Sequence, residues 1–151
     1  MNTSSKWLVK VSLLNLVSNA IGIVIALQHN LISDLGGSLH GQNVFHDFLT
    51  TTGTALSAPL PFMLIQIVLT LLALQTNKSR TIGIIGLSFV GFFYTLAQAG
   101  ERILFRLLSP GGFDLVQAIV FLVNVASAIA MLVFGIRAWR SRQTPEAIAV
   151  T

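Results

Sequence analysis

Four long apolar runs constrain this 151-residue chain more than any other feature of its sequence. Each run has about the 20 residues that a helix needs to cross the roughly 30 Å hydrocarbon core of a bilayer. The runs cover about residues 7–27, 58–75, 82–104 and 115–136. Because lipid cannot satisfy free backbone groups, we expect all four to be helices. The sequence therefore predicts an all-α integral membrane protein, a single domain built as a bundle of four transmembrane helices.

Composition agrees with a membrane environment and excludes several classes of function. Charged residues make up only 9% of the chain and hydrophobic residues 54%, whereas a soluble domain has about 25% charged residues. There is no cysteine, which excludes disulfides, thiolate metal sites and iron–sulfur clusters. The net charge is +4, but the basic residues form no stripe and are not interleaved with aromatic residues. We therefore exclude nucleic acid as a partner.

The distribution of basic residues predicts the orientation of the bundle. Seven of them lie before the first run, in the 76–81 turn or after the fourth run: Lys6, Lys10, Lys78, Arg80, Arg137, Arg140 and Arg142. By the positive-inside rule, both termini are cytoplasmic, the basic tail 137–151 is inside and the loop 28–57 is external. We expect a bacterial inner membrane, with this loop on the periplasmic side.

Carboxamide side chains lie close to mid-membrane in three of the runs. They belong to Asn19, Gln66 and Asn124, and Asn15 lies one helical turn before Asn19 on the same face. Facing lipid they would be costly, so we expect them inside the bundle, bonded to one another or to backbone. Packing between helices is the favoured interpretation. A pore or a ligand channel is the alternative.

The third run ends at the outer side in the charged sequence GERILFR, residues 100–106. One interpretation is a pair of arginines, Arg102 and Arg106, whose side chains reach the interface, with Glu101 paired to Arg106 or to a basic group on another helix. The other is a site for an anion or a lipid headgroup. Its candidate binding residues are Arg102, Arg106, Gln98 and Gln117.

The external loop 28–57 holds all three histidines of the chain. His29 lies on the same helical face of the first run as Asn15, Asn19, Gly22 and Ala26, so we expect it to face the bundle. His40 and His46 are six residues apart, which matches no metal-binding helix motif. We expect no cofactor. A divalent metal held by His29, His40, His46 and Asp47 is a weak alternative. Haem is another weak alternative, and its second axial ligand could not be a histidine from another run, because no second run carries one.

Residues 44–56 of the loop predict a short amphipathic helix on the outer interface. The preceding segment, residues 36–41, predicts a flexible turn.

Three functional hypotheses follow. The first is a small non-catalytic accessory or assembly subunit, or a binding scaffold, in a membrane complex, with the lipid bilayer and other membrane chains or further copies of itself as partners. The second is a membrane enzyme or a redox or cofactor-binding protein acting on a lipid or quinone-like substrate at the outer leaflet. In that case Glu101 is the acid–base candidate, and His29 or His46 relays protons.

The third hypothesis is an oligomeric channel. An enzyme should enclose a pocket that reaches Glu101 and the arginines. A scaffold should instead pack its polar stripes fully.

Overall fold

The computed structural model describes residues 2–35, 39–50, 52–76, 78–109 and 112–143. Four long helices dominate it: α1 (Thr3–His29), α3 (Leu60–Leu74), α4 (Ser79–Gly100) and α6 (Leu115–Gln143). Two short helices, α2 (Val44–Thr50) and α5 (Ile103–Leu107), lie in the connections. A two-residue antiparallel pair, β1 (Asp34–Leu35) with β2 (Leu39–His40), precedes α2.

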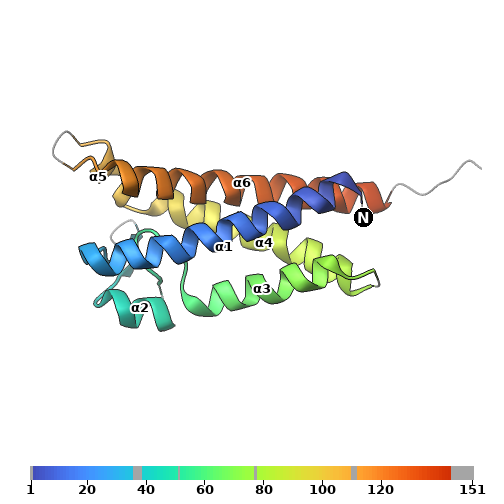
Figure 1. Cartoon of the computed structure of the whole chain (residues 1–151), viewed down its shortest axis with the longest axis horizontal. Helices are drawn as coiled ribbons and strands as arrows, with labels where there is room; N and C mark the ends of the chain where they lie inside the picture. Colours follow the sequence, from blue (N-terminus) through green and yellow to red (C-terminus); the bar gives the residue numbers. More distant parts are fainter. Residues whose placement is uncertain (1, 36–38, 51, 77, 110–111, 144–151) are drawn as a thin grey trace, which may run out of the picture.

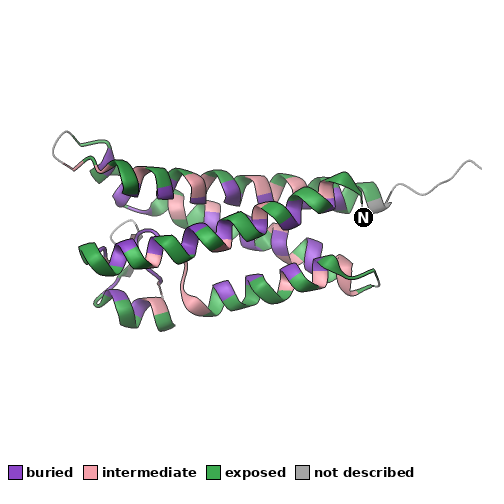
Figure 2. Ribbon diagram, in the orientation of Figure 1, coloured by how far each residue is buried: buried purple, intermediate pink, exposed green. Residues whose placement is uncertain are grey.

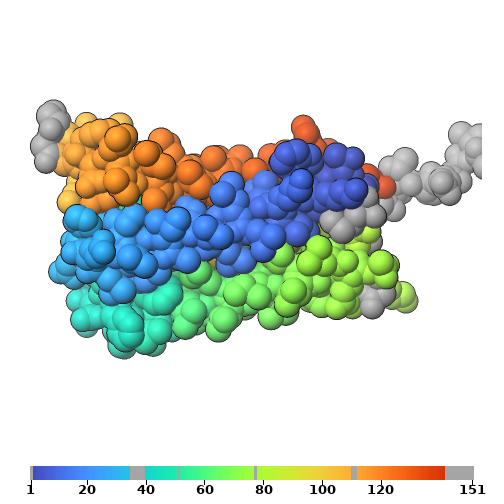
Figure 3. Space-filling view, in the orientation of Figure 1, coloured from blue at the N-terminus to red at the C-terminus, as the bar shows by residue number. Residues whose placement is uncertain are grey.

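The long helices lie side by side along the longest axis of the molecule (Figure 1). Both α1 and α4 pack against α3 and α6, so the four form a closed ring. The N-terminus and the end of α6 lie at one end of this bundle, and α2 and α5 lie at the other. The ribbons of α1 and α3 stand apart in Figure 1, but their side chains close the space between them in Figure 3.

Three of these helices are long and apolar enough to cross a membrane, namely α1, α4 and α6. Helix α3 has 15 residues, which at 1.5 Å per residue extend about 22 Å. That is shorter than the roughly 30 Å core of a bilayer. The second apolar run thus forms a shorter helix than the 58–75 that its sequence predicts.

Each long helix turns one face into the bundle and exposes another (Figure 2); many of the buried residues are polar, whereas many of the exposed ones are large and apolar. In α1, Asn15 is fully buried, whereas the side chains of Leu13 and Val17 are 51% and 57% exposed. Exposed leucine, isoleucine, valine and phenylalanine side chains continue over the outer faces of α3, α4 and α6. Soluble monomers rarely expose apolar surface on this scale.

Two helix ends differ from those that the sequence predicts. Helix α4 ends at Gly100 and not near 104, because Glu101 is extended and the Arg102 N–H donates to the Asp34 carbonyl (3.1 Å). At the other end of the bundle, α6 continues to Gln143, so residues 137–143 of the basic tail belong to this helix. This extension packs inward through Ala138, which is fully buried. Residues 144–151 of the predicted tail lie outside the described residues.

The connection between α1 and α3 is partly ordered by one carboxylate. Asp47 is buried and accepts hydrogen bonds from the N–H groups of Gln42 (2.7 Å) and Asn43 (2.9 Å) at the start of α2. The predicted helix over 44–56 is shorter than expected, since α2 ends at Thr50 and Gly53 adopts a positive φ of 77°. Of the predicted turn at 36–41, residues 36–38 lie outside the described residues.

Candidate ligand-binding cavity

Residues 52–59, the inserted segment, run as non-helical backbone into the bundle between α2 and α3. Thr54 and Ser57 close a tight turn, and Leu56 at its tip is only 2% exposed. Two carboxamides satisfy the backbone of this segment. Asn124 donates to the Leu56 carbonyl (2.8 Å), and Asn19 accepts from the Ala58 N–H (2.6 Å). Irregular backbone at such depth needs partners of this kind, because apolar surroundings offer none.

The carboxamides expected near mid-membrane lie together. Asn15 donates to Ser127 (2.8 Å) and accepts from Asn19 (3.1 Å) and from Gln66 (3.3 Å). All four carboxamide residues are at most 1% exposed. They connect α1, α3 and α6 and also hold the inserted segment in place.

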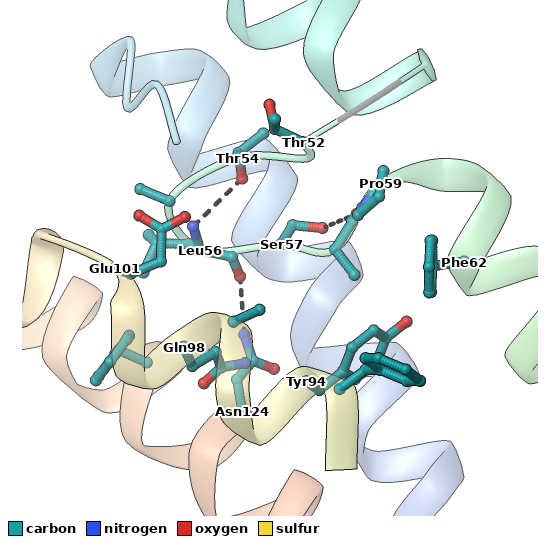
Figure 4. A pocket seen from close by; sticks show the side chains of 15 residues that line it. Thr52, Thr54, Leu56, Ser57, Pro59, Phe62, Tyr94, Gln98, Glu101 and Asn124 are labelled. Atoms are coloured by element: carbon teal, nitrogen blue, oxygen red, sulfur yellow. Dashed lines mark hydrogen bonds between the residues drawn. The ribbon is translucent and has the colours of Figure 1, made fainter. Parts of the chain in front are cut away.

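A cavity of about 410 Å³ lies beside the inserted segment (Figure 4). Its walls come from this segment, the start of α3, the second half of α4 and the adjoining part of α6. Phe62, Phe93 and Phe121 contribute apolar surface. Hydrogen-bonding side chains also line it, namely Thr52, Thr54, Ser57, Tyr94, Gln98, Glu101 and Asn124.

Four of these residues carry a buried atom that has no hydrogen-bond partner among the described residues. The atoms are Thr52 Oγ1, Tyr94 Oη, Gln98 Oε1 and Asn124 Oδ1. For Asn124 the chemical identity of the free atom is fixed, because its Nδ2 is the one that donates to Leu56. Buried polar atoms are nearly always paired in native proteins, and each unpaired one costs about 1–3 kcal/mol. Ser5, Gln66 and Gln117 carry such an atom elsewhere in the bundle, but four of these residues line this one cavity, which makes it the candidate binding site.

Glu101 stands at the outer end of the cavity, just beyond α4, and is 5% exposed. Its carboxyl oxygens accept bonds from the Ser33 hydroxyl and from the Asp34 N–H (3.1 Å). Burial raises the pKa of this carboxyl above its ordinary value, and the charge of Asp34 raises it further. The two hydrogen bonds act in the opposite direction but do not cancel the effect.

Glu101 also borders a second hollow, the outer cleft, of about 280 Å³. Arg102, Arg106, Asp34 and His40 line this cleft. Arg102 Nη1 lies 3.2 Å from Asp34 Oδ2, and His40 Nδ1 lies 3.5 Å from the same oxygen. The pairing of Glu101 with Arg106 is wrong: among the described residues, the ion pairs do not include Glu101, and Arg102 pairs with Asp34.

The histidines do not converge. His29 is exposed and does not face the bundle, because the last turn of α1, from Leu27 onward, extends past its packed neighbours. His46 is 69% exposed, with Nδ1 3.6 Å from its neighbour Asp47. Within the described part of the chain, no three histidine or acidic residues lie close enough together to hold a metal ion.

The four predicted anion-binding residues are divided between different places. Gln98 lines the cavity, while Arg102 and Arg106 line the outer cleft. Gln117 is 2% exposed in the first turns of α6 and belongs to neither lining.

Sequence reasoning missed the inserted segment and Tyr94. A signal for Tyr94 exists, since it is the only tyrosine of the chain and lies one turn before Gln98 in α4. For the inserted segment the only hint is the small-residue composition of TTGTALSAP, residues 51–59.

Comparison of the chain with protein-family models, with curated proteins and with solved structures finds no match. Any functional conclusion therefore depends on the residues themselves.

Proposed function

We propose that this chain is a four-span membrane protein that binds a small, uncharged, hydroxyl-bearing apolar ligand, such as a lipid alcohol or a quinol, in the cavity beside the inserted segment. The observation that carries the proposal is the set of four unpartnered atoms around the cavity, on Thr52, Tyr94, Gln98 and Asn124. The proposal requires binding and no catalytic step.

The chemistry of these atoms selects a hydroxyl group. Asn124 Oδ1 is buried and can only accept a hydrogen bond, so a ligand that displaces its neighbours far enough to reach it must supply a donor. The Tyr94 and Thr52 hydroxyls can both donate and accept. An alcohol or phenol does both with one oxygen, whereas an ether or a quinone only accepts. Neither Arg102 nor Arg106 is among the described residues of the lining, which favours an uncharged head.

The size and walls of the cavity suit an apolar body. Its volume of about 410 Å³ falls within the roughly 300–1,000 Å³ of small-molecule sites. Phenylalanines from α3, α4 and α6 line it, and the same helices expose apolar side chains over the outside of the bundle. A ligand that dissolves in the membrane can therefore reach the cavity by way of apolar surface.

The proposed topology has both termini in the cytoplasm and residues 28–57 outside, in a cytoplasmic membrane such as the inner membrane of a bacterium. Helix α3 and the inserted segment together make the second passage, which supplements the short reach of α3. The seven basic residues on the predicted cytoplasmic side support this orientation. Trp7 stacks on Phe134 with ring centroids 6.2 Å apart, and Lys10 Nζ lies 5.1 Å from the centroid of the Trp7 ring. Such amphipathic residues favour the membrane interface.

The expected role as an accessory or assembly subunit stays a prediction, since the structure holds a single chain. It is compatible with the proposed binding, because a ligand site can serve a larger complex. A channel of several copies likewise stays a prediction.

The experiment measures equilibrium binding of tritiated farnesol to the purified protein in nanodiscs. Two competitors are compared, unlabelled farnesol and farnesyl methyl ether. We expect farnesol to compete at about 5- to 140-fold lower concentration than the ether, because the ether leaves Asn124 Oδ1 unpaired, which costs about 1–3 kcal/mol.

Tyr94→Phe is the test variant and Thr95→Val its matched control. Tyr94→Phe should weaken farnesol binding about 2- to 10-fold through one lost hydrogen bond. Thr95 bonds its own helix at Gly91 (2.8 Å) and is not among the lining residues, so Thr95→Val should bind as the wild type does. Equal competition by alcohol and ether, or no saturable binding, would contradict the proposal.

A further inference from the structure

Glu101 is the one acidic residue that borders both the cavity and the outer cleft, among the described residues that line them. The cleft holds exposed side chains, with His40 67% and Arg102 63% exposed. Glu101 itself is 5% exposed. Glu101 thus lies between a cleft with exposed charged side chains and a cavity lined mainly by apolar side chains; Figure 4 shows its carboxyl group on the cavity side.

The contacts of Glu101 accommodate both of its protonation states. One oxygen accepts from the Ser33 hydroxyl and the other from the Asp34 N–H. When the carboxyl binds a proton, the Ser33 hydroxyl can rotate to accept it, since a hydroxyl is both donor and acceptor. A carboxylate fixed by an arginine could not change state so readily, and the ion pairs of the described residues leave Glu101 out.

The charged groups around Glu101 all lie on the cleft side. Asp34 comes from β1, His40 from β2, and Arg102 and Arg106 from the segment beginning after α4. Arg102 is engaged with Asp34. On the cavity side, the described lining from the inserted segment, α3 and α6 has no titratable side chain, and α4 contributes only Tyr94. A proton lost from Glu101 therefore has its route toward the cleft.

We propose that Glu101 is the proton-exchanging group of this site: it takes a proton from outside water through the outer cleft when a ligand fills the cavity, and returns it when the ligand leaves. The inference deepens the proposed function and rests on it. Filling the cavity with an apolar body removes water from the carboxyl, which disfavours its charged form. Ligand and proton then bind together, the O–H bond forming on a carboxylate oxygen of Glu101.

The coupling has a defined limit. If one proton is taken up per ligand, the affinity falls at most tenfold for each pH unit above the pKa of Glu101. The burial that raises this pKa places the fall closer to neutral pH than for an exposed glutamate.

The test is the dissociation constant of tritiated farnesol in nanodiscs of uncharged lipid, measured from about pH 5 to about pH 9, where ordinary histidines also titrate. In the wild type we expect affinity to fall as pH rises. In Glu101→Gln we expect the affinity of the wild type at low pH, unchanged across the range, since glutamine imitates the protonated acid. His40→Gln is the control, and its profile should match that of the wild type.

Ser33→Ala provides a second variant that keeps the carboxyl. Because the Ser33 hydrogen bond lowers the pKa of Glu101, its loss should move the midpoint of the profile to higher pH and leave the slope as it was. In the wild type, the infrared difference spectrum on adding farnesol should also gain the C=O band of a protonated carboxyl, and Glu101→Gln should lack it.

The outcomes separate the two proposals. Saturable binding that does not depend on pH, or a pH profile that Glu101→Gln keeps or His40→Gln abolishes, would overturn the proton coupling and leave the ligand site intact. Absence of binding at every pH would overturn the ligand site itself.

Discussion

Gly22 is the position where one methyl group should test the inserted segment. A Cβ added at Gly22 would lie against the Leu56 carbonyl oxygen, 2.9 Å from the Leu56 carbonyl carbon and 3.3 Å from its Cβ. This backbone cannot move away freely, because Asn124 holds the Leu56 carbonyl (2.8 Å) and Asn19 holds the Ala58 N–H (2.6 Å). Gly22→Ala must therefore displace the wall of the cavity or bend α1.

The magnitude follows from two opposing terms. Overpacking a well-packed interior costs about 1–3 kcal/mol, while replacing glycine by alanine within a helix gains about 0.5–1 kcal/mol. The net loss is about 0–2.5 kcal/mol, and its middle value of about 1 kcal/mol lowers the Tm of a chain of this length by about 2–4 °C. Leu56 lines the cavity, so farnesol binding should weaken as well.

Gly86→Ala is the matched control for Gly22→Ala. Gly86 also lies within a long helix, but a Cβ there would meet the end of the Leu69 side chain, with Cδ1 at 2.8 Å. A leucine tip can rotate where a held backbone cannot, so the Tm of Gly86→Ala should stay the same or rise. The assay is thermal unfolding of both variants in one detergent, followed by tryptophan fluorescence. If Gly22→Ala is as stable as Gly86→Ala and binds farnesol equally well, the packing of the inserted segment described above is incorrect.

Three further predictions concern charge, orientation and the support of the inserted segment. The pKa of Glu101 is raised in the folded protein. The stability that the Glu101 carboxyl contributes is therefore fully present at pH values below its ordinary pKa of about 4.3, and it is lost as pH rises through the raised pKa of the folded protein. The Tm advantage of Glu101→Gln over the wild type should therefore grow with pH, and a constant difference would contradict it. Since the chain has no cysteine, His40→Cys and Thr76→Cys provide single labelling sites. In intact cells a membrane-impermeant maleimide should label the first and not the second, and the reverse pattern would invert the topology. Asn124→Leu should lower the free energy of unfolding by about 1–3 kcal/mol, because it leaves the Leu56 carbonyl unpaired. Unfolding in denaturant measures this loss, and an unchanged free energy of unfolding would show that the bond is unimportant.

The helices could be predicted from the sequence because their signal is local. A run of apolar residues of sufficient length suffices to indicate a helix, and Asn15 and Asn19 recur at the spacing of one helical face. The end of α4 could not be predicted in this way. Apolar residues continue after Arg102, and the break depends on the hydrogen bonds of residues 101–102 to Ser33 and Asp34, which are distant in sequence.

The cavity depends on still more distant relations. The inserted segment has no periodic pattern, and it is held by Asn19 and Asn124, which come from the first and last long helices. Sequence spacing placed these carboxamides inside the bundle but could not assign them a backbone partner. His29 shows the opposite limit: helical spacing put it on the buried face, but spacing does not say where the neighbouring helices end.

Photolabelling with a diazirine analogue of farnesol tests the central claim most directly. The purified protein in nanodiscs is irradiated with the probe, and the labelled residues are identified by mass spectrometry with and without excess unlabelled farnesol. A ligand in the cavity should label the inserted segment, Phe62, the last two turns of α4 from Phe93 onward or the adjoining Glu101, and free farnesol should remove this label. Label spread over outward-facing residues such as Leu13 and Leu64, unaffected by free farnesol, would show only contact with the bilayer and contradict the ligand site.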